Sequence, residues 1–412
     1  MLCRTRRSGL LSKLSGGPAF GGLAGGVDGA SCRAVASRAG ICREPENMLR
    51  KGSSGFPGAD CWRRLRRSQV VRRLRHRCEY FGMLWLSKGI PRLPRAAVLR
   101  LATVAGWVGY WVDRRGRKLA LENLSLAVRH GGLELGGRST TAVVRACYQN
   151  FARNFLDLFW FAGIPRDRVW DWIDVDGAER LERSLADGRG AIHITPHFGL
   201  FELTSLTVGF LGQQLQIVAR DFRNPRLTKI FAEARGSSGH RTHHRDGVML
   251  RLLRALRRGE HVAMLTDLAV PPQGAATLIR QFGVRSSVTA LHVELSKRCD
   301  APIVAAVCEP TDDGRAKLRL LDIFSPPGDE DRRGSRAQRC EMTQRIWDVF
   351  EVAIRRRPEM WLWMYPHWRY RPAGPVGEDD AQASAYPGYA IPNAEFGKLC
   401  RIQVADDESS GP

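Results

Sequence analysis

The chain has 412 residues, a net charge of +22 and an apolar share of 43%. This length and composition are enough for one large domain, or two smaller ones, with a buried core. The ten cysteines are scattered, with no Cys-x-x-Cys pair and no regular framework. This pattern argues against a disulfide-stapled secreted domain and against a structural zinc site.

Positive charge is concentrated at the N-terminus. Residues 1–79 hold 17 Lys and Arg against 5 Asp and Glu, whereas residues 80–412 hold 47 against 37. The first segment is rich in Gly, Ser and Arg and lacks sustained apolar periodicity, so we expect a disordered basic extension. Its Arg-rich, acid-poor composition also fits a targeting segment. A start assigned too far upstream, with Met48 or Met83 as the first residue, explains it equally well.

Such a charge balance makes nucleic acid and an anionic membrane the candidate partners. The densest basic run, residues 63–77, has no interleaved aromatic pattern, and no recognised nucleic-acid module follows it. We therefore expect no nucleic acid partner and interpret the run as a solvated or lipid-facing arm.

The most apolar stretch, residues 96–112, is interrupted only by Arg100. As a helix it would be about 26 Å long, which is shorter than the ~30 Å hydrocarbon core of a bilayer. Interfacial aromatic residues lie near its end and cations follow at once: Trp107, Tyr110, Trp111, Arg114, Arg115, Arg117 and Lys118. We expect a membrane-anchoring helical segment over residues 80–118. A buried core helix is the alternative.

Helical and extended patterns alternate through the middle of the chain. Strands are predicted at residues 191–194, 215–220, 261–266 and 302–308, and helices at residues 140–162, 179–186, 200–211, 225–234, 248–257 and 288–298. This alternation predicts an α/β fold with a mixed, largely parallel sheet flanked by helices. Ligands of such sheets bind at the carboxyl ends of the strands, where His197, Arg220 and Asp267 are expected.

His197 and Glu202 form the candidate catalytic pair. The sequence GAIHITPHFGLFE, residues 190–202, indicates a buried strand, a break at Thr195-Pro196 and the start of a helix. His197 on the turn and Glu202 in the first helical turn, where the helix dipole favours a carboxylate, are able to converge. A histidine base oriented by a carboxylate suits general-base catalysis. Because neither neighbour of His197 is Ser or Cys, we expect a substrate hydroxyl to attack an activated acyl group.

The segment from His197 to Glu202 resembles the His-x4-acid signature of membrane glycerolipid acyltransferases. More narrowly, it is similar to the lipid A biosynthesis acyltransferases, the bacterial lauroyl/myristoyl transferase family, over roughly residues 80–371. The resemblance implies a glycerolipid acyltransferase-like domain over residues 119–371, followed by a flexible tail over residues 372–412. It implies a membrane-associated O-acyltransferase that moves a fatty acyl chain from an acyl thioester to a hydroxyl of a lipid A precursor, with His197 as the base.

Further motifs of this family map onto the chain with some departures. The substrate-binding residues that the resemblance implies are Arg220, Asn224, Arg235 and Asp267. Arginine suits this role because its guanidinium binds phosphate bidentately, although ordinary surface charge is the alternative. Asp267 could position a substrate or hold Arg235, and Leu268 replaces an expected Gln. Partial matches also occur at Phe282-Gly283, Trp361-Leu-Trp363 and His367-Trp-Arg369, where the tryptophans could equally belong to the core.

The family also implies partners and a location. The donor would be an acyl carrier protein or acyl-CoA, the acceptor a phosphorylated glycolipid, and the support an anionic membrane surface. The location would be the bacterial inner membrane, with the active site on the cytoplasmic face. No metal or redox cofactor is implied, and a metal site at His193, His197 and Glu202 is disfavoured because Pro196 breaks their register. We expect His240, His243 and His244 to be solvated.

Two other interpretations stay open. The first is the same chemistry on another acceptor, such as a phosphatidylinositol mannoside or an ornithine lipid, with acyl-CoA as donor. The second is a catalytically silent relative that binds membranes or nucleic acid, which the departures at Leu268 and around Phe282 keep possible.

Overall fold

The computed structural model describes residues 69–185, 188–219, 222–243, 247–272, 274–326, 334–373 and 389–392. The chain divides into two compact units, Met1–Glu79 and Tyr80–Pro412, and the site lies in the second. Residues 69–79, which we expected to be disordered, are helical and begin helix α3 (Gln69–Gly89). The rest of the predicted extension, and most of the predicted C-terminal tail, lie outside the described residues.

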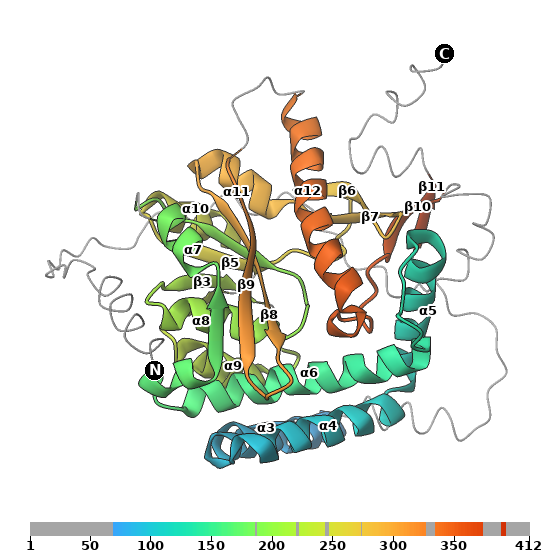
Figure 1. Cartoon of the computed structure of the whole chain (residues 1–412), viewed down its shortest axis with the longest axis vertical. Coiled ribbons are helices and arrows are strands. Elements are labelled where there is room, and N and C mark those ends of the chain that lie inside the picture. Colours follow the sequence, from blue (N-terminus) through green and yellow to red (C-terminus); the bar gives the residue numbers. More distant parts are fainter. Residues whose placement is uncertain are drawn as a thin grey trace, which may run out of the picture. The chain divides into compact units, whose positions relative to one another are not determined.

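A mixed sheet forms the centre of the second unit (Figure 1). Among the described residues, seven strands form it in the order β1-β9-β8-β2-β5-β3-β4. Their bounds are β1 Ile173–Asp176, β2 Ile192–Thr195, β3 Leu215–Val218, β4 Arg241–His243, β5 His261–Leu265, β8 Ile303–Pro310 and β9 Ala316–Phe324. Only the β8–β9 pair is antiparallel in this sheet. The predicted α/β fold with a largely parallel mixed sheet is confirmed.

Helices cover both faces of the sheet. Their bounds are α4 Arg95–Val112, α5 Arg114–Gly131, α6 Thr140–Gly163, α7 Ala178–Leu185, α8 Phe201–Phe210, α9 Pro225–Gly236, α10 Val248–Arg257, α11 Leu291–Cys299 and α12 Gly334–Arg356, with 3-10 turns at Ile90–Arg92, Arg166–Asp171 and Pro358–Met360. Side chains that alternate along β8 separate two cores. Ile303, Ala305 and Val307 pack with residues of α5, α10 and α12, whereas Ala306 and Cys308 pack with residues of α4, α6, α8 and α9.

A hairpin that the sequence reading missed joins β6 (Ala276–Gln281) to β7 (Val284–Thr289). Its two turn residues, Phe282 and Gly283, have φ values of 49° and 75°, the backbone hand that two-residue hairpins favour. Because β7 extends to Thr289, α11 begins at Leu291 and not at residue 288 as predicted. A second small parallel pair joins β10 (Tyr370–Ala373) to β11 (Tyr389–Pro392).

The predicted membrane-anchoring segment is helix α4, which lies along α6 (Figure 1). Its buried stripe follows the four-residue helical spacing: Val98, Ala102, Gly106 and Tyr110. At Gly106 the helices touch so closely that an added Cβ would lie 2.3 Å from the Cα of Gln149. No helix among the described residues is long and apolar enough to cross a membrane. A spanning role for α4 is therefore unsupported.

The start of α4 is fixed by a buried ion pair. Arg95 donates from Nη1 to Oδ1 of Asp157 on α6 at 2.5 Å, and from Nε to the carbonyl of Gly314 at 3.0 Å. The guanidinium also lies 4.9 Å from the ring centroid of Trp160. A buried charge is tolerated when it is paired and hydrogen-bonded in this way. Helix α4 is thus anchored to α6 at its first residue and at Gly106.

We expect Gly106→Ala to destabilise the protein by about 1–3 kcal/mol, because the methyl group would overlap the α6 backbone and overpack the contact. The matched control is Gly82→Ala in helix α3, where an added Cβ meets nothing within 4 Å. Removal of a helical glycine there should be neutral or stabilising by up to about 1 kcal/mol. Thermal unfolding of both variants in detergent measures the difference. Equal midpoints would contradict the close α4–α6 contact.

Candidate active site

His197 lies just beyond the carboxyl end of β2, a strand in the interior of the sheet. Its turn is tight: the N–H of Phe198 donates to the carbonyl of Pro196 at 2.7 Å. Gly199 follows with a φ of 56°, and a Cβ there would lie 2.3 Å from the carbonyl oxygen of Cys308. Only glycine fits this position without strain. Helix α8 then begins at Phe201, so the strand, the turn and the helix occur where the sequence predicts them.

The acid that contacts His197 is Asp267. The two side chains meet at 2.7 Å between Nδ1 and Oδ1, and the backbone N–H of His197 donates to Oδ2 at 2.9 Å. The pairing of β2 with β5 explains this meeting, because Thr195 aligns with Leu265. His197 lies two residues after Thr195, and Asp267 lies two residues after Leu265. Asp267 is predicted as a substrate-binding residue and Glu202 as the orienting acid. In the structure the Asp267 carboxylate contacts His197, whereas the Glu202 carboxylate binds Arg235.

The surroundings of the pair keep Asp267 ionised. Burial raises the pKa of the Asp267 carboxyl, but the charge and hydrogen bonds of His197 outweigh it and hold that pKa well below its usual range. An ionised Asp267 only accepts hydrogen bonds, so Nδ1 of His197 carries a proton, and in the neutral ring Nε2 is the nitrogen with the lone pair. The His197 side chain is 14% exposed. This arrangement is that of a general base with its orienting carboxylate.

Aromatic rings enclose His197 on two sides. Tyr365 stacks on it, with ring centroids 6.3 Å apart and planes inclined by 14°, and Phe201 meets it edge-on at 5.1 Å. The Tyr365 hydroxyl donates to the carbonyl of Ala269 at 3.3 Å. Burial and the nearby Asp267 charge raise the pKa of Tyr365 to about 12. Tyr365 is therefore a neutral wall of the site and not an acid at physiological pH.

Glu202 pairs with Arg235. The guanidinium donates from Nε to Oε2 at 2.9 Å and from Nη2 to Oε1 at 2.6 Å. Both side chains are largely buried, at 7% and 14% exposure. Burial opposes the charge on Arg235, but the Glu202 carboxylate outweighs it and raises the pKa of Arg235. The backbone N–H of Glu202 also donates to Oδ1 of Asn154 on α6. Glu202 thus ties α8 to α9 and α6.

The other predicted substrate-binding residues are placed differently. Asn224 is buried, and its Oδ1 accepts from the N–H of Arg226 as the cap of α9. Arg220 lies outside the described residues, so its role stays a prediction. Among the residues that the structure describes, no group of three or more His, Cys, Asp or Glu side chains could hold a metal ion.

Two expectations about peripheral residues need correction. His240 is buried and not solvated: its Nδ1 accepts from the N–H of Leu215 and its Nε2 lies 2.7 Å from the carbonyl of Ser205. His243 is half-buried and contacts Oε1 of Gln216. The His240 ring links two backbone segments, because an imidazole offers one donor and one acceptor. His244 lies outside the described residues.

Sequence reasoning did not foresee a third contact of Asp267. The indole N–H of Trp361 donates to its Oδ2 at 2.9 Å. The sequence motif Trp361-Leu-Trp363 resembles a motif of the family, but it is equally compatible with a purely structural role in the core. The ring is fully buried and stacks on His367 with centroids 3.7 Å apart. Burial lowers the pKa of His367 to about 4, so this second histidine is neutral.

Comparisons with known proteins agree with this geometry. A family model described as bacterial lipid A biosynthesis acyltransferase matches residues 66–370. The chain is 24% identical to the lipid A biosynthesis palmitoleoyltransferase of Escherichia coli over 293 residues, 71% of this chain and 90% of that protein. It is 23% identical to the lipid A biosynthesis lauroyltransferase of the same organism over 301 residues, 71% of this chain and 91% of that protein. A Shigella flexneri protein named lipid A biosynthesis acyltransferase is 24% identical over 293 residues, 71% of this chain and 90% of that protein.

The family match covers well over half of the chain and includes both β2 and β5, which carry the candidate dyad. The sequence-based assignment to this family, and to acyltransferases, is confirmed. The chain belongs to the bacterial lipid A biosynthesis acyltransferase family and is an acyltransferase.

Proposed function

We propose that the protein transfers a fatty acyl chain from an acyl thioester to a hydroxyl of a phosphorylated lipid A precursor, with His197 as general base and Asp267 as its orienting acid. The observation that carries this proposal is the contact of Nδ1 of His197 with Oδ1 of buried Asp267 at 2.7 Å. It revises the predicted pair, because the carboxylate of Glu202 is bound by Arg235.

The steps of the proposed reaction follow from the His197 tautomer that carries its proton on Nδ1. Nε2 of His197 takes the proton of the acceptor hydroxyl while the hydroxyl oxygen attacks the thioester carbonyl carbon. Asp267 stabilises the imidazolium that forms through the Nδ1–H bond. When the tetrahedral intermediate collapses, the carbon–sulfur bond breaks and the departing thiolate takes the proton from Nε2. The products are an ester and a free thiol, and His197 returns to its neutral form.

Arg235 is the proposed phosphate-binding residue. Its Nε and Nη2 are bound to Glu202, whereas Nη1 donates to no group among the described residues. Glu202 holds the guanidinium in one orientation, and a fixed arginine binds phosphate with less loss of entropy than a free one. The phosphate would belong to the acceptor glycolipid or to the phosphopantetheine arm of the donor, which acyl carrier protein and acyl-CoA share.

We expect His197→Ala and Asp267→Asn to lower kcat by about 100-fold or more, because the first removes the base and the second its orienting charge. Glu202→Gln should lower kcat by a smaller factor. The assay follows acyl transfer from labelled acyl carrier protein, or from acyl-CoA, to a lipid A precursor by the purified protein in detergent.

His130→Ala, a half-buried histidine near the end of α5, is the control and should keep wild-type activity. Full activity of Asp267→Asn together with loss in Glu202→Gln would return the orienting role to Glu202. Full activity of His197→Ala would overturn general-base catalysis. A wild type that transfers only from acyl-CoA, or only to another glycolipid, would change the substrate and leave the chemistry in place.

We expect Arg235→Lys to raise the KM for the phosphorylated acceptor about tenfold with a smaller change in kcat, because lysine loses the bidentate fork that Glu202 orients. Arg226→Lys is the matched control, since Arg226 is an exposed arginine of the same helix. Steady-state kinetics with acceptors that carry or lack phosphate measures the effect. An equal rise in KM for both acceptors would argue against phosphate binding by Arg235.

We also propose that the protein docks on the cytoplasmic face of the bacterial inner membrane through the outer face of α4. This face exposes large apolar side chains: Val104, Trp107, Val108, Trp111 and Val112. The exposed cations Arg114 and Arg115 follow at once. Tryptophan beside basic residues favours the interface of an anionic bilayer. A helix that is buried on one side and apolar on the other would lie in the interface and not span it.

We expect Trp107→Ser with Trp111→Ser to weaken binding to vesicles of phosphatidylglycerol and phosphatidylethanolamine at least tenfold, because two large interfacial rings are lost. Leu250→Ser with Val352→Ser, which alters exposed apolar residues of α10 and α12, should bind like the wild type. Vesicle co-sedimentation at several salt concentrations measures both. Unchanged binding of the tryptophan variant would exclude the α4 face as the docking surface.

A further inference from the structure

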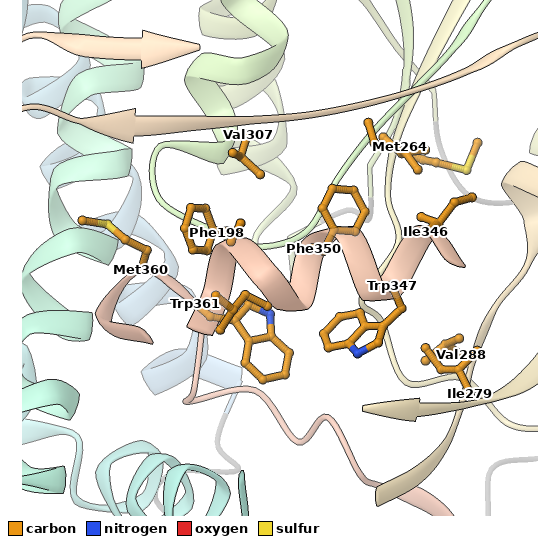
Figure 2. Packing of buried hydrophobic residues seen from close by; sticks show 14 of the residues in the cluster. Phe198, Met264, Ile279, Val288, Val307, Ile346, Trp347, Phe350, Met360 and Trp361 are labelled. Carbon is orange, nitrogen blue, oxygen red and sulfur yellow. The ribbon is translucent and has the colours of Figure 1, made fainter. Parts of the chain in front are cut away.

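The segment that follows α12 holds the His197 turn by its backbone. The N–H of Gly199 donates to the carbonyl of Met360 at 2.8 Å, and the N–H of Leu362 donates to the carbonyl of His197 at 3.0 Å. Phe198 and Trp361 form an antiparallel bridge between these two bonds. Figure 2 shows Trp361 below Phe198. Residues 360–362 are therefore in register with the catalytic turn.

The side chain of Trp361 extends the same contact to the acid of the dyad. Asp267 accepts from the ring of His197 on Oδ1, and from the backbone N–H of His197 and the indole N–H of Trp361 on Oδ2. One residue thus bridges both halves of the dyad, since its backbone pairs with the histidine turn and its indole binds the carboxylate. The sequence separates it from Asp267 by 94 positions.

The indole has no freedom to turn away. Its ring is fully buried, and its centroid lies 3.7 Å from that of His367, 4.7 Å from Trp363, 5.5 Å from Trp347 and 5.6 Å from Phe282. A donor fixed by packing costs no reorganisation when charge develops in the site. Trp361 is hence a rigid hydrogen-bond donor and not only a space-filling ring.

We propose that Trp361 is a positioning residue of the reaction: its indole N–H fixes the plane of the Asp267 carboxylate, and thereby the orientation of the His197 ring. The inference rests on the proposed His197–Asp267 chemistry. The terminal torsion of an aspartate is broad, and the two other donors to the carboxylate, the imidazole and the backbone N–H, both belong to His197. The indole supplies a donor that is independent of the histidine turn. A carboxylate free to rotate would leave Nδ1 misaligned, and this misalignment would slow the chemical step.

Trp363 provides a matched control two residues further along. It is the same residue type, it is also fully buried, and it packs on Phe282 and Trp361. Its indole N–H is also used, but it donates to the backbone carbonyl of Pro358 at 2.6 Å and not to Asp267. Replacement of either tryptophan by Phe removes a buried indole and one hydrogen bond. Only the change at Trp361 removes a donor to the dyad.

The test compares Trp361→Phe with Trp363→Phe, each in the wild type and in Asp267→Asn, by single-turnover acyl transfer together with thermal unfolding. We expect Trp361→Phe to lower kcat by about 10- to 100-fold with KM within about threefold of the wild type. Trp363→Phe should stay within about threefold in kcat. In the Asp267→Asn background, Trp361→Phe should not lower kcat any further, because Trp361 acts through the Asp267 carboxylate.

Other outcomes would overturn the inference. Equal losses in the two Phe variants, or the same factor lost with and without Asp267, would reduce Trp361 to a packing residue. Full activity of Asp267→Asn would instead refute the dyad itself, so the two failures are distinguishable. If Trp361→Phe unfolds at a lower temperature than Trp363→Phe, benzothienylalanine at each position decides. This analogue replaces the indole N–H by sulfur at nearly constant shape, and a loss of kcat confined to position 361 is the expected result.

Discussion

The parallel pairing of β2 with β5 is the constraint on which the site depends. Four consecutive residue pairs, from Ile192 with Val262 to Thr195 with Leu265, fix the register. After the last pair both strands end on the same side of the sheet. Two residues further along each segment, the side chains of His197 and Asp267 are in contact. A slip of one residue would turn every side chain of the strand to the other face, so the buried apolar residues that fix the register also fix the dyad.

The site places several charges in the interior, and each has its partner. Asp267 is balanced by N–H donors of His197 and Trp361, and Glu202 by the fork of Arg235. Removing one member of such a buried pair typically costs about 3–5 kcal/mol. Their strict pairing therefore constrains where α8, α9 and the segment after α12 are able to lie. Stability and the proposed function are coupled at Asp267, because the buried carboxylate that needs these donors is also the proposed orienting acid of His197.

The sequence predicted the fold class, the carboxyl ends of β2 and β5 to within one residue, and the position of His197 on the turn, because apolar periodicity and the break at Thr195-Pro196 are local signals. It placed Asp267 at the same sheet edge but assigned the orienting role to Glu202, which lies five residues from the histidine. A prediction from local sequence favours the acid that is nearer to His197 along the chain. Which acid contacts His197 depends instead on the strand register and on the contact of Glu202 with Arg235, and both are tertiary interactions. The contact of Trp361 with Asp267 could not be predicted for the same reason, since it joins segments 94 residues apart.

Helix α6 connects the proposed membrane face to the catalytic centre. On one side it receives α4 at Gln149 and Asp157, opposite the apolar stripe that includes Trp107 and Trp111. Its Asn154, three residues before Asp157, accepts the backbone N–H of Glu202. If the proposed function holds, a lipid acceptor would present its hydroxyl near the bilayer interface, and the proposed base would need to be held at a fixed distance from that interface. Helix α6 (Thr140–Gly163), bonded to both elements, would meet this requirement.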